Sequence, residues 1–239
     1  HLKKNLMTIN FSIILPVVNE LENLKILIPF IKKKFKKFKY EIIIVDDNSS
    51  DGTKNVFNKK KNKIRHYLRK KDPSLGKSIL LGILKSTYDN IVIMDSDFNH
   101  DPNDLSKMIR YAKEKNGSKF FVSGSRFVKN GYGNNFFRHY SSKFYSLIIS
   151  LILFLSVKDM LSGYCCFNKK NFSKEELNKI FYGYGEFYMR LLYVANLKNI
   201  KIFEVPVVYG KRIYGESKSN FIKMALNYFY QSLQIRKTF

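Results

Sequence analysis

The fold is decided by residues 11–47, which read FSIILPVVNELENLKILIPFIKKKFKKFKYEIIIVDD. The two ends of this stretch, residues 11–18 and 40–47, are short runs rich in β-branched apolar residues, and such runs predict buried strands. Between them, apolar residues recur at helical spacing opposite a face of lysines; they are Leu24, Leu27, Ile31, Phe35 and Phe38. A strand, an amphipathic helix and a second strand in this order predict a βαβ unit.

The same alternation continues through the first half of the chain. Residues 64–68, 90–94 and 119–124 predict further strands, and helical stretches follow Leu75 and Pro102. Apolar strands separated by helices predict an α/β fold of the Rossmann-like kind, with a mostly parallel sheet flanked by helices on both faces. Ligands of such sheets bind beyond the carboxyl ends of the strands.

The alternation ends after about residue 126. Residues 128–138 are rich in glycine and asparagine and predict a loop, whereas an apolar segment follows at 144–157. A helix is expected around 186–198 and a strand at 201–208. Because the chain contains no internal repeat and no low-complexity linker, we expect a single domain over residues 1–239.

Composition narrows the kinds of partner. The 239 residues include 43 Lys and Arg against 19 Asp and Glu, a net charge of +24. This excess predicts an anionic partner, namely nucleic acid, a membrane surface or a phosphorylated substrate. The only cysteines, Cys165 and Cys166, are adjacent, so we expect core thiols and a reducing compartment. The apolar run 147–155 is shorter than the ~20 residues that cross a bilayer, so no spanning segment is expected.

Two acids follow a predicted strand in IVIMDSDFNHDP, residues 91–102. Unpaired carboxylates ~4 Å apart would repel by about 4 kcal/mol at an effective dielectric constant of about 20, so we expect a cation beside Asp95 and Asp97. Mg²⁺ or Mn²⁺ fits best, because such hard cations use oxygen ligands to grip a diphosphate. Asn99 or His100 could add a ligand or an outer contact.

A simpler interpretation of this stretch is a capping cluster for the helix after Pro102, with Asp101 and Asn103 as the capping residues. A similar choice exists in YEIIIVDDNSSDGT, residues 40–53. There, Asp46 or Asp47 could accept hydrogen bonds from a nucleobase or ribose, or serve turn and capping chemistry, and both roles are compatible.

Basic residues in glycine-bearing loops are candidates for binding two anionic groups, one on a donor and one on an acceptor. They are Arg126, Arg138, Arg212 and Lys218. The stretch RKKDPSLGKS, residues 69–78, lacks the first glycine of a phosphate loop, which argues against a Walker-type NTPase.

Five segments occur in a recognisable order: ILPVVNELENL, IIIVDDNSSDGT, IVIMDSDFNHDP, FVSGSRF and EVPVVYGKRIYGESK. Together they resemble inverting glycosyltransferases with the GT-A fold and, more narrowly, the dolichol-phosphate mannosyltransferases. The resemblance covers roughly residues 10–220, and its R-x-Y-G-x-S-K motif is more specific than D-x-D. The chain is similar to the shorter members, which depend on small membrane subunits for anchoring.

The resemblance implies a role for each candidate residue. The nucleotide pocket would be lined by Pro16, Val18, Glu20, Val45 and Asp47. The metal and the sugar diphosphate would be held by Asp95, Ser96 and Asp97, with Asn99 as a further metal ligand. Donor phosphates would meet Arg126, Arg212 and Lys218, and the lipid phosphate would meet Arg138. The chain departs from the family where Val18 replaces an aromatic residue, Cys165 an arginine, and Asn99 a glutamine or serine.

The implied reaction is transfer of mannose from GDP-mannose to dolichyl phosphate with inversion, with Asp97, Arg126, Arg138 and Arg212 as the catalytic residues. A phosphate oxygen is already anionic at neutral pH, so no strong general base is needed. The implied location is the cytosolic face of the endoplasmic reticulum membrane, as a peripheral protein. Two alternatives remain: a glucosyltransferase that uses UDP-glucose on the same lipid, and a basic nucleic-acid-binding module.

Two segments could contact a membrane. Residues 140–157, YSSKFYSLIISLILFLSV, are too short to span a bilayer but very apolar, which indicates either an interfacial helix or a buried core helix. Residues 220–237 predict an amphipathic helix, for a membrane surface, a partner or core packing.

Overall fold

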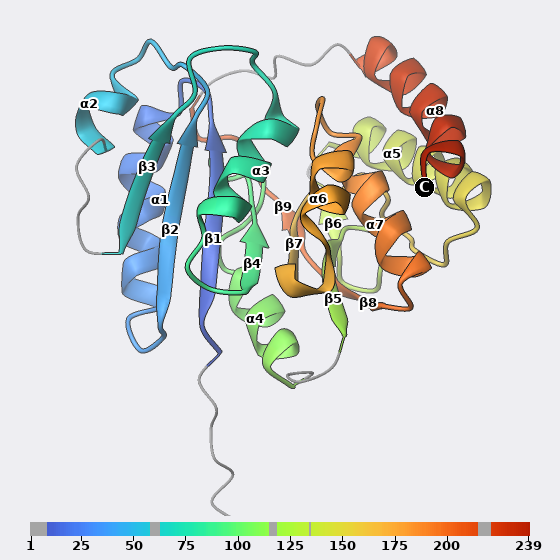
Figure 1. The fold of residues 1–239 in the computed structure, drawn as a ribbon, viewed down its shortest axis with the longest axis horizontal. Helices are drawn as coiled ribbons and strands as arrows, with labels where there is room; N and C mark the ends of the chain where they lie inside the picture. The colour runs from blue at the N-terminus through green and yellow to red at the C-terminus, as the bar shows by residue number, and fades with distance from the viewer. Residues whose placement is uncertain (1–8, 58–62, 115–118, 134, 215–220) are drawn as a thin grey trace, which may run out of the picture.

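The computed structural model describes residues 9–57, 63–114, 119–133, 135–214 and 221–239 (Figure 1). Within these residues a seven-stranded sheet has the order β3-β2-β1-β4-β7-β5-β8. Its strands are β1 (Phe11–Val17), β2 (Tyr40–Asp46), β3 (Ile64–Leu68), β4 (Asn90–Ile93), β5 (Phe120–Ser125), β7 (Cys165–Asn168) and β8 (Lys201–Pro206). A separate two-stranded ladder joins β6 (Tyr132–Gly133) to β9 (Val208–Tyr209).

Helices cover both faces of this sheet, as expected. They are α1 (Leu21–Lys34), α2 (Thr53–Phe57), α3 (Leu75–Lys85), α4 (Leu105–Glu114), α5 (Phe136–Leu153), α6 (Lys174–Ile180), α7 (Phe187–Leu197) and α8 (Phe221–Thr238), with a 3-10 turn at Lys169–Asn171. Figure 1 shows α5 and α8 side by side at the end of the molecule away from β3. None of the described helices is both long and apolar enough to cross a membrane.

The predicted βαβ unit is present. β1 pairs in parallel with β2 from Phe11 opposite Tyr40, and also pairs in parallel with β4. Alternate side chains of β1 point to opposite faces of the sheet. Ile13 packs in the core cluster that contains side chains of α1, and Ile14 packs in the core cluster that contains side chains of α3. Burial on both faces explains why these strands read as continuous apolar runs rather than as an alternating pattern.

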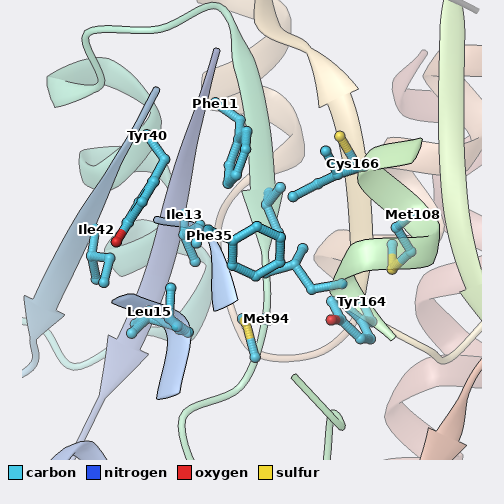
Figure 2. Close-up of a cluster of buried hydrophobic side chains, with 14 of the residues drawn as sticks. Phe11, Ile13, Leu15, Phe35, Tyr40, Ile42, Met94, Met108, Tyr164 and Cys166 are labelled. Atoms are coloured by element: carbon cyan, nitrogen blue, oxygen red, sulfur yellow. The ribbon is translucent and has the colours of Figure 1, made fainter. Parts of the chain in front are cut away.

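The core on the α1 side is dominated by large side chains. Figure 2 shows Phe11, Phe35 and Tyr40 together with the sulfur-containing side chains of Met94 and Cys166. The ring of Phe11 meets that of Phe35 edge-on at 5.7 Å and stacks on that of Tyr40 at 5.9 Å. Such pairs add specific geometry to the burial of apolar area, so this cluster holds β1, β2 and the end of α1 together.

β7 is the strand that the sequence did not predict. It lies between β4 and β5 and runs antiparallel to both. Its four residues include the two cysteines, whose side chains enter opposite core clusters, so each is a core thiol as expected. Burial raises the pKa of both thiols, that of Cys166 to about 12. Cys165 is fully buried, so its side chain is not available to an acceptor.

The boundaries in the second half differ from those expected. Residues 128–138 are not a continuous loop, because they contain β6 and the first turn of α5. The helix begins at Phe136 because the Asn135 side chain accepts a hydrogen bond from the backbone N–H of Arg138 at 2.9 Å. The helix expected around 186–198 and the strand expected at 201–208 are present as α7 and β8. The single-domain organisation over residues 1–239 stays a prediction.

Glu41 joins three segments at the amino end of β2. Its carboxylate accepts hydrogen bonds from the Ser12 hydroxyl at 2.7 Å, the Thr87 backbone N–H at 2.5 Å and the Arg65 guanidinium at 3.0 Å. Burial alone would raise the pKa of Glu41, but these hydrogen bonds outweigh burial and lower the pKa. The carboxylate therefore contributes stability above the pKa of the unfolded chain, and that contribution is lost as the pH falls through the folded-state pKa.

We predict that Glu41→Ala lowers the free energy of unfolding by about 3 kcal/mol at pH 7, because three donors lose their acceptor. The difference from the parent protein should shrink as the pH falls below about 4, where the unfolded-state glutamate is protonated. Urea unfolding across this pH range measures both effects. Glu22→Ala is the matched control, since Glu22 is exposed and pairs only with an exposed lysine. An equal loss in both variants would contradict the prediction.

Candidate active site

A cavity of about 760 Å³ opens beyond the carboxyl ends of β1, β2 and β4, where the sequence placed a ligand. Residues from both halves of the chain line it. The predicted site residues that line the cavity are Pro16, Val18, Glu20, Asp47, Asp95, Ser96, Asp97, Asn99, Arg126, Arg138 and Arg212. The structure therefore brings together eleven predicted side chains that are spread over almost 200 positions of sequence.

Among the described residues, one predicted site residue does not line this cavity. Val45 was expected to line the nucleotide pocket, but it is fully buried within β2, where it pairs with Pro16 of β1. A strand covered on both faces places such a side chain in the core, so the expectation for Val45 is corrected. Lys218 lies outside the described residues.

The acidic loop that follows β4 holds Asp95 and Asp97 in different surroundings. The Asp95 side chain is 40% exposed, whereas that of Asp97 is only 7% exposed. Asp97 accepts a hydrogen bond from the Asn99 backbone N–H at 2.9 Å and forms an ion pair with the Arg212 guanidinium, also at 2.9 Å. Burial and the neighbouring charge of Asp95 raise the pKa of Asp97, and Arg212 opposes this rise.

These carboxylates fit a hard divalent cation. Two oxygen-donor side chains face the cavity, and burial together with the charge of Asp95 raises the pKa of Asp97, so a positive charge beside them would be favourable. Among the described residues there is no cluster of three or more His, Cys, Asp or Glu that could hold a metal. Mg²⁺ commonly uses one or two carboxylates and takes its remaining ligands from substrate phosphates and water, so Asp95 and Asp97 suffice.

The capping interpretation of this loop named Asp101 and Asn103, and the structure shows a side-chain-to-backbone hydrogen bond between these two residues. Asp101 accepts a hydrogen bond from the Asn103 backbone N–H at 2.8 Å, just before α4 begins. Asp95 and Asp97 take no part in that turn. His100, suggested as a ligand or an outer contact, accepts a hydrogen bond through Nδ1 from the Asp95 backbone N–H at 2.9 Å.

The acids at the end of β2 are divided between turn chemistry and the cavity. Asp46 is fully buried and accepts a hydrogen bond from the Ser49 backbone N–H at 2.8 Å. Asp47 lines the cavity, and its two oxygens accept from the Arg69 guanidinium at 2.8 Å and the Ser74 backbone N–H at 2.7 Å. Asp47 thus fixes the loop that leads into α3 against the cavity wall.

Arg126 lies at the end of β5 and is held by Asp159. Its Nε and Nη2 atoms each donate to one Asp159 oxygen at 2.8 Å, a bidentate geometry. Both side chains are buried, and burial alone would lower the pKa of Arg126, but Asp159 outweighs it and raises the pKa. The guanidinium also lies over the Tyr209 ring, 4.4 Å from its centroid. Arg126 is therefore a permanently charged group of fixed orientation at the cavity.

The first turn of α5 closes the same side of the cavity. Arg138 lies there beside His139, whose Nδ1 accepts a hydrogen bond from the Gly133 backbone N–H at 3.1 Å. Partial burial and the positive charges of Arg126 and Lys143 lower the pKa of His139. Burial is the larger cause, but the nearness of the two cations also indicates positive potential, so this part of the cavity favours an anion.

Beyond the arginines, the cavity becomes apolar between α5 and α8. Tyr145, Met224, Ala225 and Tyr228 line this end, and the Tyr145 hydroxyl donates to the Ala225 carbonyl. Sequence reasoning did not identify these residues, nor Asp159, His139 and Tyr209. These residues carry no local pattern that distinguishes them from core residues.

Comparisons with known proteins agree with this geometry. Residues 12–175 match the family model described as glycosyl transferase family 2. The chain is 34% identical to the dolichol-phosphate mannosyltransferase of Pyrococcus furiosus over 87% of its own length and 58% of that protein's. It is 26% identical to the polyprenol monophosphomannose synthase of Mycolicibacterium smegmatis, over 86% of this chain and 79% of that one. The chain thus spans less than two thirds of the Pyrococcus relative.

Among solved structures, glucosyl-3-phosphoglycerate synthase from Mycobacterium tuberculosis, solved in complex with Mn²⁺, uridine diphosphate and phosphoglyceric acid, is similar. The TM-score is 0.70 at 15% identity, over 95% of this chain and 78% of that one, and this likeness concerns the fold. The mixed sheet flanked by helices agrees with the GT-A architecture expected from the sequence. From its match over most of its length, the chain belongs to glycosyl transferase family 2, a family of glycosyltransferase enzymes.

Proposed function

We propose that this protein transfers mannose from GDP-mannose to the phosphate of a polyprenyl carrier such as dolichyl phosphate, with inversion and with Mg²⁺ or Mn²⁺ as cofactor. One observation carries the proposal: a single cavity joins the Asp95 and Asp97 carboxylates, three arginines and an apolar end between α5 and α8. The carboxylates suit a metal-bound donor diphosphate, the arginines suit an acceptor phosphate, and the apolar end suits a lipid chain. The names of the two mannose-transferring relatives support the choice of sugar and carrier.

At the donor end, Asp95 and Asp97 would hold the divalent cation. The cation, when bound, supplies positive charge that stabilises the departing diphosphate. The Arg212 guanidinium lies 2.9 Å from the Asp97 carboxylate. From there it can add a second positive charge beside the departing diphosphate. Asp47 and the loop that it fixes form the wall on which the nucleoside rests.

At the acceptor end, Arg126 and Arg138 bind the lipid phosphate and hold it close to a donor that is also anionic. The phosphate oxygen attacks the anomeric carbon on the face opposite the leaving diphosphate, so the configuration inverts. That oxygen is already ionised, so no side chain has to remove a proton from it. The rate enhancement therefore arises from positioning and from fixed positive charge.

The donor is tested by turnover with GDP-mannose and with UDP-glucose on the same short polyprenyl phosphate, each with and without Mn²⁺. We expect transfer from GDP-mannose that depends on the metal and at least about tenfold less from UDP-glucose, because base-specific hydrogen bonds discriminate strongly. Preference for UDP-glucose would replace the proposed donor and keep the acceptor. The family match does not favour the nucleic-acid-binding alternative.

We further propose that α5 and α8 lie on the membrane surface that contains the lipid acceptor. Large apolar side chains of α5 point outward while its serines Ser142, Ser146 and Ser150 are buried, the reverse of a soluble helix. The outward residues are Phe136, Phe137, Tyr140, Phe144, Leu147 and Leu151, followed by Phe154 at the end of the helix. α8 exposes Leu226, Phe229, Tyr230 and Leu233 in the same way.

This arrangement supports the interfacial interpretation of residues 140–157. One side of α5 is core, since Ile149 and Leu153 pack against the sheet, and the other side is an exposed apolar stripe. An interfacial helix has this character, and the positive charge of the chain adds attraction to anionic headgroups. Residence at the cytosolic face of the endoplasmic reticulum, and anchoring by small subunits, stay predictions.

We predict that Phe137→Glu, Leu147→Glu and Leu151→Glu together reduce partitioning to vesicles of phosphatidylcholine and phosphatidylserine by at least about tenfold, because three apolar side chains lose their contact with the membrane. Vesicle flotation measures this. The control carries Ile26→Glu, Val56→Glu and Leu84→Glu, three exposed apolar residues of α1, α2 and α3. Equal flotation of both triple variants would contradict the membrane contact of α5.

A further inference from the structure

His100 is a buried imidazole behind the acidic loop that the mechanism above does not use. It is 1% exposed, and its ring stacks on that of Tyr164 with centroids 4.6 Å apart and planes at 11°. It is not among the residues that line the cavity. A histidine in such a place has to direct both ring nitrogens toward protein groups, because buried polar atoms need hydrogen-bond partners.

The partners of the two nitrogens determine where the proton resides. Nδ1 lies 2.9 Å from the Asp95 backbone nitrogen, which is a donor, so Nδ1 accepts. The neutral ring therefore carries its proton on Nε2. That nitrogen lies 2.9 Å from the Tyr209 hydroxyl and 3.1 Å from the Ser162 carbonyl oxygen, both of which accept. It also lies 3.6 Å from an Asp95 carboxylate oxygen, which is too far for a hydrogen bond. Tyr209 in turn donates to the Ser162 carbonyl, so the direction of every hydrogen bond is consistent.

Tyr209 connects this network to the arginine at the acceptor end. Its ring lies against the Arg126 guanidinium, 4.4 Å from the centroid. The backbone supports the same connection, since His100 and Tyr209 form an antiparallel bridge and the Gly210 N–H donates to the Asn99 carbonyl at 3.0 Å. One ring therefore contacts the segment that places Asp95 and the segment that supports Arg126.

We propose that His100 is a positioning residue with two separable arms, in which Nδ1 orients Asp95 for the donor and Nε2, through Tyr209, orients Arg126 for the acceptor. His100 acts through these neighbours and touches neither substrate. The inference rests on the proposed function, because it assigns the two arms to its two substrates. Such outer hydrogen-bond partners commonly change metal affinity or activity by ~10–100-fold when removed.

Three variants separate the arms. His100→Asn offers an oxygen in place of Nδ1 and no group in place of Nε2. Tyr209→Phe keeps the ring beside Arg126 but removes the hydroxyl, and His100→Phe keeps the stack on Tyr164 but removes both nitrogens. We expect His100→Asn and Tyr209→Phe to raise KM for a short polyprenyl phosphate about tenfold, with Mn²⁺ affinity in the presence of GDP within about twofold of the parent protein.

His100→Phe should raise that KM and also weaken Mn²⁺ binding about tenfold, measured by titration without turnover. Ile109→Val, a core change in α4, is the stability control and should alter neither constant. If the KM and the Mn²⁺ affinity change in the same proportion in all His100 and Tyr209 variants, the separation into arms is wrong.

Nitrogen NMR of the His100 ring gives a test that does not depend on the substrates. We expect the proton on Nε2 and not on Nδ1, and the opposite tautomer would overturn the proposal. If the parent protein binds Mn²⁺ with GDP but transfers no sugar to polyprenyl phosphate, the proposed function is wrong. The tautomer and the Mn²⁺ affinities would still show whether Nδ1 of His100 orients Asp95.

Discussion

Asp97→Asn should lower the rate of mannose transfer by about 10³-fold, the largest effect that we expect from any single substitution. The change keeps the shape of the side chain but removes one of the two charges that hold the divalent cation at the diphosphate. Loss of a fixed electrostatic stabiliser commonly costs ~10²–10³ in rate, and a metal contributes several kcal/mol more. Initial rates at saturating donor and acceptor, over a range of Mn²⁺ concentrations, measure this loss.

The matched control is Asp101→Asn, four positions along the same loop. Asp101 caps the turn before α4 and does not line the cavity, so transfer should be retained while stability falls by about 1 kcal/mol. If Asp97→Asn retained transfer within tenfold of the parent protein with unchanged Mn²⁺ dependence, a metal role for Asp97 would be excluded.

Arg126→Gln should have the second largest effect, because it affects both folding and transfer. The substitution leaves the Asp159 carboxylate buried without its cation, and breaking such a pair costs about 3–5 kcal/mol. It also removes a fixed positive charge from the acceptor end, for which we expect about a 10²-fold loss in kcat/KM for the lipid phosphate. Urea unfolding and initial-rate kinetics on the folded fraction measure the two losses separately.

The double variant Arg126→Gln with Asp159→Asn distinguishes the two roles of Arg126. Neutralising both partners removes the buried unpaired charge, so most of the lost stability should return. Transfer should stay low, because the cavity still lacks the guanidinium. Recovery of transfer together with stability would mean that Arg126 is only a structural partner of Asp159.

The sequence determined the βαβ half of the fold because the signals there are local. Apolar periodicity of residues close together in the chain predicted β1, α1 and β2, and the acids after β2 and β4 followed from strand ends alone. Parallel strands bring their carboxyl ends to one edge of the sheet, so a predicted order of elements already placed Asp47 and Asp95 together. The same logic did not find β7, since a strand of four residues carries no resolvable period.

Only the tertiary structure decided the acceptor half of the site. Arg126 and Asp159 are 33 positions apart, and His100 and Tyr209 are 109 apart, so neither pairing leaves a local pattern. The sequence also did not predict which face of α5 is buried. Its serines and its large apolar residues are each compatible with core and with surface until the neighbouring helices are in place. Burial, and the direction in which a charged or aromatic side chain points, depend on long-range packing; a strand or a helix depends mainly on its own residues.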